Sequence, residues 1–260
     1  MRKIDLTQPT TQAMTLLIYG PPGVGKSTTC SMLAAAAEAR KLKATLIDAE
    51  HGLIPSAKAV GLKTTELLSA SSTGSSGEVM QELQAMIAKP QGLVVVDTIT
   101  EISGSILNDL AGASGQVQIQ MYGEQKNRLS RIVRSMRDAA GAGTVAIATA
   151  QQDAQDIEGL PGNWHPAVRK ALVTDLVSQF DCVARLRQVA AHESEALGLP
   201  EGVRYLDFRP SPSQVAKCRT AAELFPDTDS RWHLWPLRNE EDTTRLFAAL
   251  IRRTSGKAEK

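Results

Sequence analysis

Apolar residues along the chain gather in short continuous runs. Four of these runs predict buried strands, at 15–20 (TLLIYG), 44–48 (ATLID), 93–97 (LVVVD) and 143–150 (GTVAIATA). Runs with little polar interruption are typical of strands in a parallel sheet that is covered on both faces.

Helical patterns occupy the stretches between these runs. The Ala-rich segment 27–40 predicts one helix, and a capping box of Ser75 and Glu78 predicts the start of another. The spacing i, i+3, i+4, i+7 predicts a third helix, through Leu129, Ile132, Val133 and Met136. A last helix is expected at 241–253, where acids come first and arginines last, as the helix dipole favours.

The remaining segments are less regular. Loops are expected at 103–125, which is rich in Gly, Ser and Gln, and at 151–170, which holds two prolines. Further strands are expected at 180–186, 203–208 and 214–218.

The alternation predicts one α/β domain, with a largely parallel central β-sheet flanked by helices, over residues 14–253. Residues 1–13 would form an N-terminal extension and 254–260 a flexible tail.

Composition excludes several classes of protein. With 42% hydrophobic and 22% charged residues, the 260-residue chain is neither disordered nor fibrous. No apolar run is long enough to cross a bilayer, and no secretory signal is visible, so we expect no membrane association and a cytoplasmic location. The net charge of +1 leaves nucleic acid possible only through a local basic patch. The three cysteines form no CxxC pair, which argues against a zinc ribbon.

A phosphate-binding loop follows the first predicted strand. The sequence matches G-x-x-x-x-G-K-[ST] at every fixed position. The expected nucleotide-binding residues are Gly20, Pro21, Pro22, Gly23, Val24, Gly25, Lys26, Ser27 and Thr28. Glycines let backbone N–H groups surround phosphates, Lys26 adds a positive charge, and the Ser27 hydroxyl would complete a Mg²⁺ shell. ATP and Mg²⁺ are the expected cofactors.

Asp97 is the second candidate of this site. It ends the apolar strand 93–97, where an acid beside a phosphate loop can hold Mg²⁺. Many strands end in Asp, so this assignment depends on the matched phosphate loop.

The stretch Thr45 to Pro55 (TLIDAEHGLIP) resembles the RecA family of recombinases, in which the strand after the phosphate-loop helix ends in Asp-Ala-Glu-His. The resemblance implies that Glu50 is the general base that orients the attacking water. It also implies that Gln151, at the end of the strand ending Ala148-Thr149-Ala150, senses the γ-phosphate; the adjacent Gln152 leaves the register open by one residue.

The same resemblance implies that single-stranded DNA binds the two loops after the later strands, at about 103–125 and 153–170. The DNA-binding candidates there are Tyr122, Trp164, Arg169 and Lys170, which would combine base stacking with phosphate contact. The alternative is an ordinary surface loop with a buried Trp.

More closely, the chain is similar to short, phage-encoded RecA-like ATPases used in single-strand annealing and recombination. It shares a Leu-Pro-Gly segment at 160–162, a Phe-Asp pair at 180–181 and an Ala-Lys-x-Arg strand at 216–219. This resemblance implies that Lys217 and Arg219 reach the γ-phosphate of a neighbouring subunit in a homo-oligomer. A solvated strand face is the alternative.

The chain departs from the RecA pattern in two places. Ile54 stands where RecA has an acid that helps read adenine, which leaves the base preference open. Only about 13 residues precede the first strand, too few for the amino-terminal unit by which RecA forms filaments.

The expected function is therefore a Mg²⁺-dependent RecA-like ATPase acting on single-stranded DNA. Two alternatives remain: a nucleotide-gated mediator that loads a single-strand-binding or recombination protein with little turnover, and a small-substrate P-loop kinase. DNA-stimulated hydrolysis, partner capture and phosphate transfer would respectively distinguish the three.

Overall fold

A computed structural model of the chain describes residues 14–69, 92–138, 143–153, 162–219 and 234–255, with five further positions between 77 and 85. The predicted extension 1–13, most of the helix predicted from Ser75, and Leu160-Pro161 lie outside these residues.

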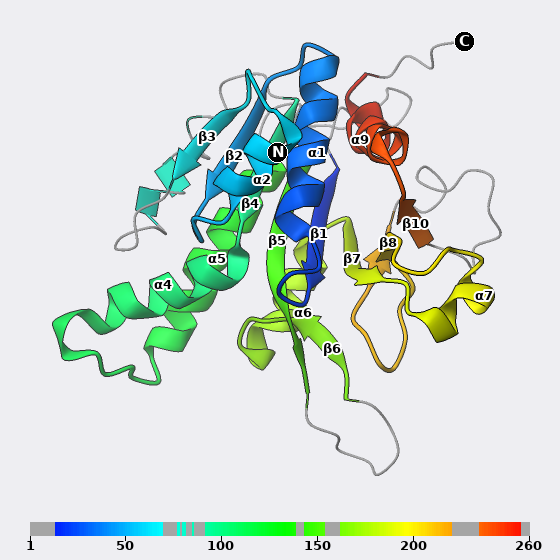
Figure 1. Cartoon of the computed structure of the whole chain (residues 1–260). Coiled ribbons are helices and arrows are strands. Elements are labelled where there is room, and N and C mark those ends of the chain that lie inside the picture. The colour runs from blue at the N-terminus through cyan, green and yellow to red at the C-terminus, as the bar shows by residue number, and fades with distance from the viewer. Residues whose placement is uncertain are drawn as a thin grey trace, which may run out of the picture.

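The described strands form one mixed sheet with a parallel centre (Figure 1). Its order is β10-β8-β7-β1-β5-β4-β2-β3, with β6 paired to β5 and β9 paired to β7. The parallel strands are β7 (Cys182–Gln188), β1 (Thr15–Gly20), β5 (Gly143–Gln152), β4 (Leu93–Asp97), β2 (Ala44–Asp48) and β3 (Glu66–Ser69). The antiparallel strands are β6 (Trp164–Pro166), β8 (Arg204–Asp207), β9 (Lys217–Cys218) and β10 (Leu234–Leu237). The predicted fold class is confirmed.

Helices cover both faces of this sheet. On one face lie α1 (Lys26–Ala39), α2 (Leu53–Val60) and α9 (Glu240–Ser255), and on the other α4 (Ile99–Ala111), α5 (Met121–Asp138) and α6 (Lys170–Gln179). Two 3₁₀ turns, Gly112–Ser114 and Ala191–Glu193, and the short α7 (Ser194–Leu197) complete the described helices.

Alternation along the central strands divides the core in two. In β1, Leu16 and Ile18 pack toward α1, whereas Leu17 and Tyr19 pack toward the α4–α6 face. All four side chains are almost fully buried, which explains the unbroken apolar run in the sequence.

The prediction of a loop over 103–125 is wrong, because most of this segment belongs to α4 and α5. Ile99, Ile102 and Ile106 are fully buried at helical spacing, and Thr98 caps α4 by accepting a hydrogen bond from Glu101 N at 3.0 Å. Gln125 donates to the backbone oxygen of Ser103 at 2.9 Å. The Gly, Ser and Gln content of 103–125 predicted a loop, although these isoleucines already have helical spacing in the sequence.

The predicted loop over 151–170 is also partly wrong. β5 runs on to Gln152, and β6 folds back against it as a hairpin that reaches beyond the edge of the sheet in Figure 1. The strand predicted at 214–218 is reduced to Lys217–Cys218. The elements α2, β3, α6 and β10 were not expected from the sequence.

Glu38, at the end of α1, ties this helix to the connection before β3. Its carboxylate accepts hydrogen bonds from the backbone N–H groups of Lys63, Thr64 and Thr65 and from the Thr65 hydroxyl, at 2.6–3.1 Å. These bonds prevail over the opposing effect of desolvation and lower the pKa of Glu38 to about 2.

We expect Glu38→Gln to lower the free energy of unfolding by about 2 kcal/mol at pH 7, because a neutral amide accepts these bonds less strongly. In the wild type the carboxylate stabilises the fold above its ordinary pKa, and this stabilisation is lost as pH falls toward 2. Urea denaturation of both proteins at pH 7 and pH 3 measures the difference. An equal gap at both pH values would contradict the assignment.

Candidate functional site

The phosphate loop joins β1 to α1 at the carboxyl edge of the sheet. Gly23 and Gly25 have φ values of 76° and 98°, a left-handed conformation that glycine adopts without strain. Gly25 is the N-cap of α1, and its oxygen accepts from Thr29 N at 2.9 Å. The first turn of α1 therefore points its free N–H groups into the loop, where an anion would be stabilised.

Lys26 is folded over this loop. Its Nζ donates to the backbone oxygens of Gly20 and Pro21, both at 3.0 Å. Burial lowers the pKa of Lys26, while the charges of Asp97 and Glu50 oppose that shift. The ammonium group has neutral acceptors that a phosphate oxygen can replace.

Asp97 lies next to the first turn of α1. Ser27 Oγ donates to Asp97 Oδ2 at 2.8 Å, while Oδ1 is buried and finds no hydrogen-bond donor among the described residues. Burial, assisted by the charges of Glu50 and Asp48, raises the pKa of Asp97 to about 6 despite the Ser27 bond and Lys26.

These features fit a divalent cation. A buried carboxylate oxygen without a donor, beside a serine hydroxyl, is a hard oxygen ligand set of the kind that Mg²⁺ binds together with phosphates and water. Asp97 and Ser27 would hold the ion, as the sequence predicts.

The end of β2 brings Glu50 to the same edge. Asp48 accepts from the backbone N–H groups of Gly52 and Leu53 at 3.1 and 2.9 Å, which fixes the turn into α2. Glu50 is exposed, and its charge acts on both Lys26 and Asp97. His51 bonds Ser69 through Nδ1 at 2.9 Å, away from this group.

The β5–β6 hairpin carries the predicted sensor. Gln151 is exposed and pairs with His165 in the hairpin register. The side-chain amide of Gln152 instead donates to Gly162 O at 3.0 Å. Because the Gln152 amide already has a hydrogen-bond partner, Gln151 is the better candidate for the sensor residue.

The predicted DNA-binding residues do not form one cluster. The Arg169 guanidinium lies 3.7 Å from the centroid of the Tyr122 ring. This contact joins the segments 103–125 and 153–170, which were predicted to be the two DNA-binding loops. Lys170 instead pairs with Asp153 at 3.3 Å. Trp164 lies in a separate pocket, described below.

Lys217 and Arg219 contact the end of α6. Lys217 Nζ donates to the backbone oxygens of Val177, Ser178 and Phe180 at 2.6–3.1 Å. Arg219 is exposed and donates to Ser178 O at 3.1 Å. Both therefore stabilise a helix C-terminus within their own chain, and Arg219 is the more accessible of the two.

Arg204, at the start of β8, was missed by the sequence analysis. A methyl group on Gly25 would lie 2.9 Å from the guanidinium carbon of Arg204, so this exposed arginine lies directly against the phosphate loop. A cation beside Lys26 and the positive end of a helix dipole is unfavourable unless an anion is also present. No motif marks the residue, because its proximity depends on the pairing of β8 with β7.

We expect Arg204→Gln to weaken ATP and ADP binding alike by about tenfold, because one charge-assisted contact to the phosphates is lost. Isothermal titration measures both affinities. The matched control is Arg134→Gln, on the exposed side of α5, which is expected to change neither. Unchanged affinities for both nucleotides would contradict a phosphate contact, and an effect on ATP alone would place Arg204 at the terminal phosphate.

A second prediction concerns the charge of Asp97. Because its pKa is raised, the ionised carboxylate disfavours the folded state, and stability falls as pH rises from about 4 to above 6. Without divalent cations, Asp97→Asn should raise the free energy of unfolding by about 1–3 kcal/mol at pH 8 and change it little at pH 4. Denaturant titration at both pH values tests this; a less stable variant at pH 8 would contradict it.

Within the described part of the chain, no helix is both long and apolar enough to span a bilayer.

Comparison with known proteins agrees with this geometry. A family model described as an AAA domain matches residues 12–220. The chain is 34% identical over 134 residues to Protein RecA of Mycobacterium leprae and of Mycobacterium marinum, which is 50% of this chain and 18% and 37% of those proteins. For Protein RecA of Bifidobacterium breve the identity is 33% over 134 residues, or 32% of that protein. The match thus spans well under half of each relative.

Most of the chain is covered by the family model, and the site has the phosphate loop, the strand-end acid and the parallel sheet that such a core requires. The chain belongs to the AAA domain family, and its core is that of a nucleotide-binding, RecA-like P-loop ATPase.

Proposed function

We propose that this protein hydrolyses ATP with Mg²⁺ and acts on single-stranded DNA in homologous recombination or single-strand annealing. The observation that carries the proposal is the grouping of Lys26, Ser27, Asp97 and Glu50 at the edge from which the β5–β6 hairpin projects. The similarity to RecA proteins supports the DNA substrate.

Each side chain has a distinct part in the proposed reaction. Lys26 exchanges its two backbone acceptors for phosphate oxygens, and Ser27 and Asp97 hold Mg²⁺, which neutralises charge on the phosphates. Glu50, exposed in the same site, orients the attacking water and accepts its proton.

The hairpin offers a route from nucleotide to DNA. Gln151 lies at the nucleotide edge, and its register partner His165 is next to Trp164. His165 Nε2 lies 3.2 Å from Asp153 Oδ1, and its Nδ1 lies 2.8 Å from Pro166 O, so the imidazole braces the hairpin. A change at Gln151 is therefore transmitted through a short, bonded segment rather than through a free loop.

A homo-oligomer is part of this proposal. Arg219 is exposed and, within the described part of the chain, donates to the backbone oxygen of Ser178, so it is the better candidate for a contact with a neighbour's γ-phosphate. Lys217 would first have to give up three acceptors.

We expect single-stranded DNA to stimulate ATP hydrolysis and duplex DNA to have less effect. Glu50→Gln should retain ATP binding but lower turnover about 100-fold or more, because the positioned base is lost. Phosphate release with and without DNA, together with nucleotide binding, measures the two effects.

Lys26→Ala is the control for that experiment, since it should abolish nucleotide binding and turnover together. Full turnover by Glu50→Gln would show that another group is the base. ATP hydrolysis at the same rate with and without DNA would favour the mediator function. Phosphate transfer to a small acceptor would favour a kinase.

A further inference from the structure

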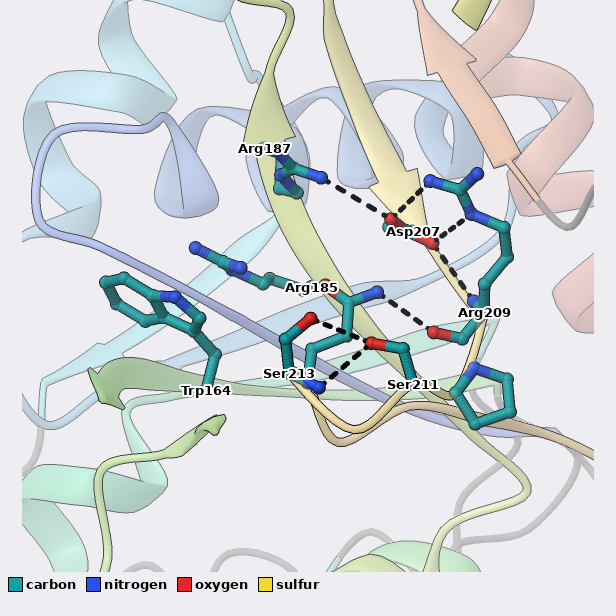
Figure 2. A pocket seen from close by; sticks show the side chains of 9 residues that line it. Trp164, Arg185, Arg187, Asp207, Arg209, Ser211 and Ser213 are labelled. Atoms are coloured by element: carbon teal, nitrogen blue, oxygen red, sulfur yellow. Dashed lines mark hydrogen bonds and ion pairs between the residues drawn. The ribbon is translucent and has the colours of Figure 1, made fainter. Parts of the chain in front are cut away.

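A cationic pocket of about 550 Å³ lies beside the β5–β6 hairpin (Figure 2). Its walls come from three distant parts of the chain: Trp164 of β6, Arg185 and Arg187 of β7, and the β8–β9 connection from Arg209 to Gln214. Arg185 pairs in register with Tyr19, whose side chain packs on the α4–α6 face, so the pocket opens on the side of the sheet opposite to α1.

The arginines of this pocket differ in their partners. Arg209 forms two bonds with the buried Asp207, at 2.9 and 2.8 Å, and Arg187 lies 3.8 Å from Asp207 and also pairs with Glu193. Arg185 has no carboxylate at ion-pair distance among the described residues, and its Nε is buried without a hydrogen-bond partner. Burial and the nearby Arg187 lower the pKa of Arg185, and the charge of Asp207 opposes this shift only in part.

Arg185 is stacked on a fixed aromatic ring. Its guanidinium carbon lies 4.1 Å from the centroid of the Trp164 ring. Figure 2 shows the Arg185 side chain extending toward Trp164. The Trp164 backbone is bonded to the segment 213–215: its N–H donates to Ser213 O at 2.9 Å, and its oxygen accepts from Val215 N at 2.8 Å. A stacked guanidinium keeps its edge N–H groups available for a planar or tetrahedral anion.

The shape of the surroundings favours a chain over a compact ligand. Arg185 and Arg187 also line a second cavity of about 570 Å³, which extends to Pro21 and Val24 of the phosphate loop. Arg185 and Arg187 thus line both the cavity beside the hairpin and the cavity beside the phosphate loop. The rim of the first pocket adds the hydroxyls of Ser211 and Ser213, which bond each other at 3.0 Å, so one of the two keeps its proton for a phosphate oxygen.

We propose that this pocket binds one nucleotide unit of the single strand, with its phosphate on Arg185 and its base against Trp164. The proposal rests on the proposed function. Of the predicted DNA contacts it keeps Trp164, and it assigns the phosphate to Arg185 instead of Arg169 or Lys170. It also makes Trp164 the point where DNA and the β5–β6 hairpin meet, and so the point from which the strand acts on Gln151.

The test compares wild type, Arg185→Gln and the control Arg134→Gln as full-length proteins, using a fluorescent oligothymidylate in an anisotropy titration at several salt concentrations. We expect Arg185→Gln to weaken binding about tenfold and to reduce the slope of log affinity against log salt by about 0.7, because one phosphate contact is lost. Arg134→Gln should change neither value.

Trp164 provides a second readout. Oligothymidylate should quench the tryptophan fluorescence of wild type, and Trp164→Phe should lose most of that change. If inorganic phosphate competes as strongly as thymidine monophosphate at the same ionic strength, the pocket takes a free phosphate group without a base, and the strand assignment is overturned.

The outcomes separate the two proposals. If wild type binds the oligonucleotide and Arg185→Gln binds it equally well with the same salt slope, the pocket is not on the strand path while the proposed function stands. If wild type binds no single strand, both proposals fail. Should Arg185→Gln fail to fold, Ser211→Asp at the exposed rim tests the same pocket, and unchanged binding by that variant overturns the proposal.

Discussion

A buried carboxylate beside a helix N-terminus is the constraint on which this site depends. Asp97 is 1% exposed, holds Ser27 through one oxygen and leaves the other without a hydrogen-bond donor among the described residues. Keeping that carboxylate charged costs stability, as its raised pKa shows. The Ser27 bond and the charge of Lys26 offset part of this cost, and a divalent cation held by Asp97 and Ser27 would offset more.

The same edge of the sheet connects the nucleotide site to the β5–β6 hairpin. Because the central strands are parallel, β1, β2, β4 and β5 all end on the side where the phosphate loop lies. β5 continues past this edge and returns as β6, and its hairpin is braced by His165 and Asp153. Gln151, at the nucleotide edge, and Trp164, in the cationic pocket, therefore lie within a few residues of each other in the paired strands.

The sequence predicted the parts of the molecule whose chemistry is local. The Gly20–Ser27 motif and the apolar strands depend on neighbouring residues, and they lie where they were expected. Asp97 was a candidate only because of the matched phosphate loop, since its bond to Ser27 joins residues 70 positions apart. Helix α4 was missed because its serines and glycine are typical of a loop in the sequence, whereas in the structure Ser103 accepts hydrogen bonds from Gln125 of α5. Arg185 and Arg204 were missed for another reason: their surroundings come from strand pairings between distant segments, which no spacing records.

The partners of the cations indicate which of them are ready for a ligand. Lys26 is held by backbone oxygens, Arg169 and Arg185 by aromatic rings, and Arg204 lies on a glycine. Neutral partners can be exchanged for an anion with little loss of charge interaction, whereas Arg187 and Arg209 would have to give up carboxylates. Lys26 and Arg204 lie at the phosphate loop, and Arg169 and Arg185 lie toward the hairpin. The cations paired with carboxylates therefore maintain the fold, whereas the cations with neutral partners are available for an anion. This second group lies at the nucleotide site and beside the place proposed for the strand.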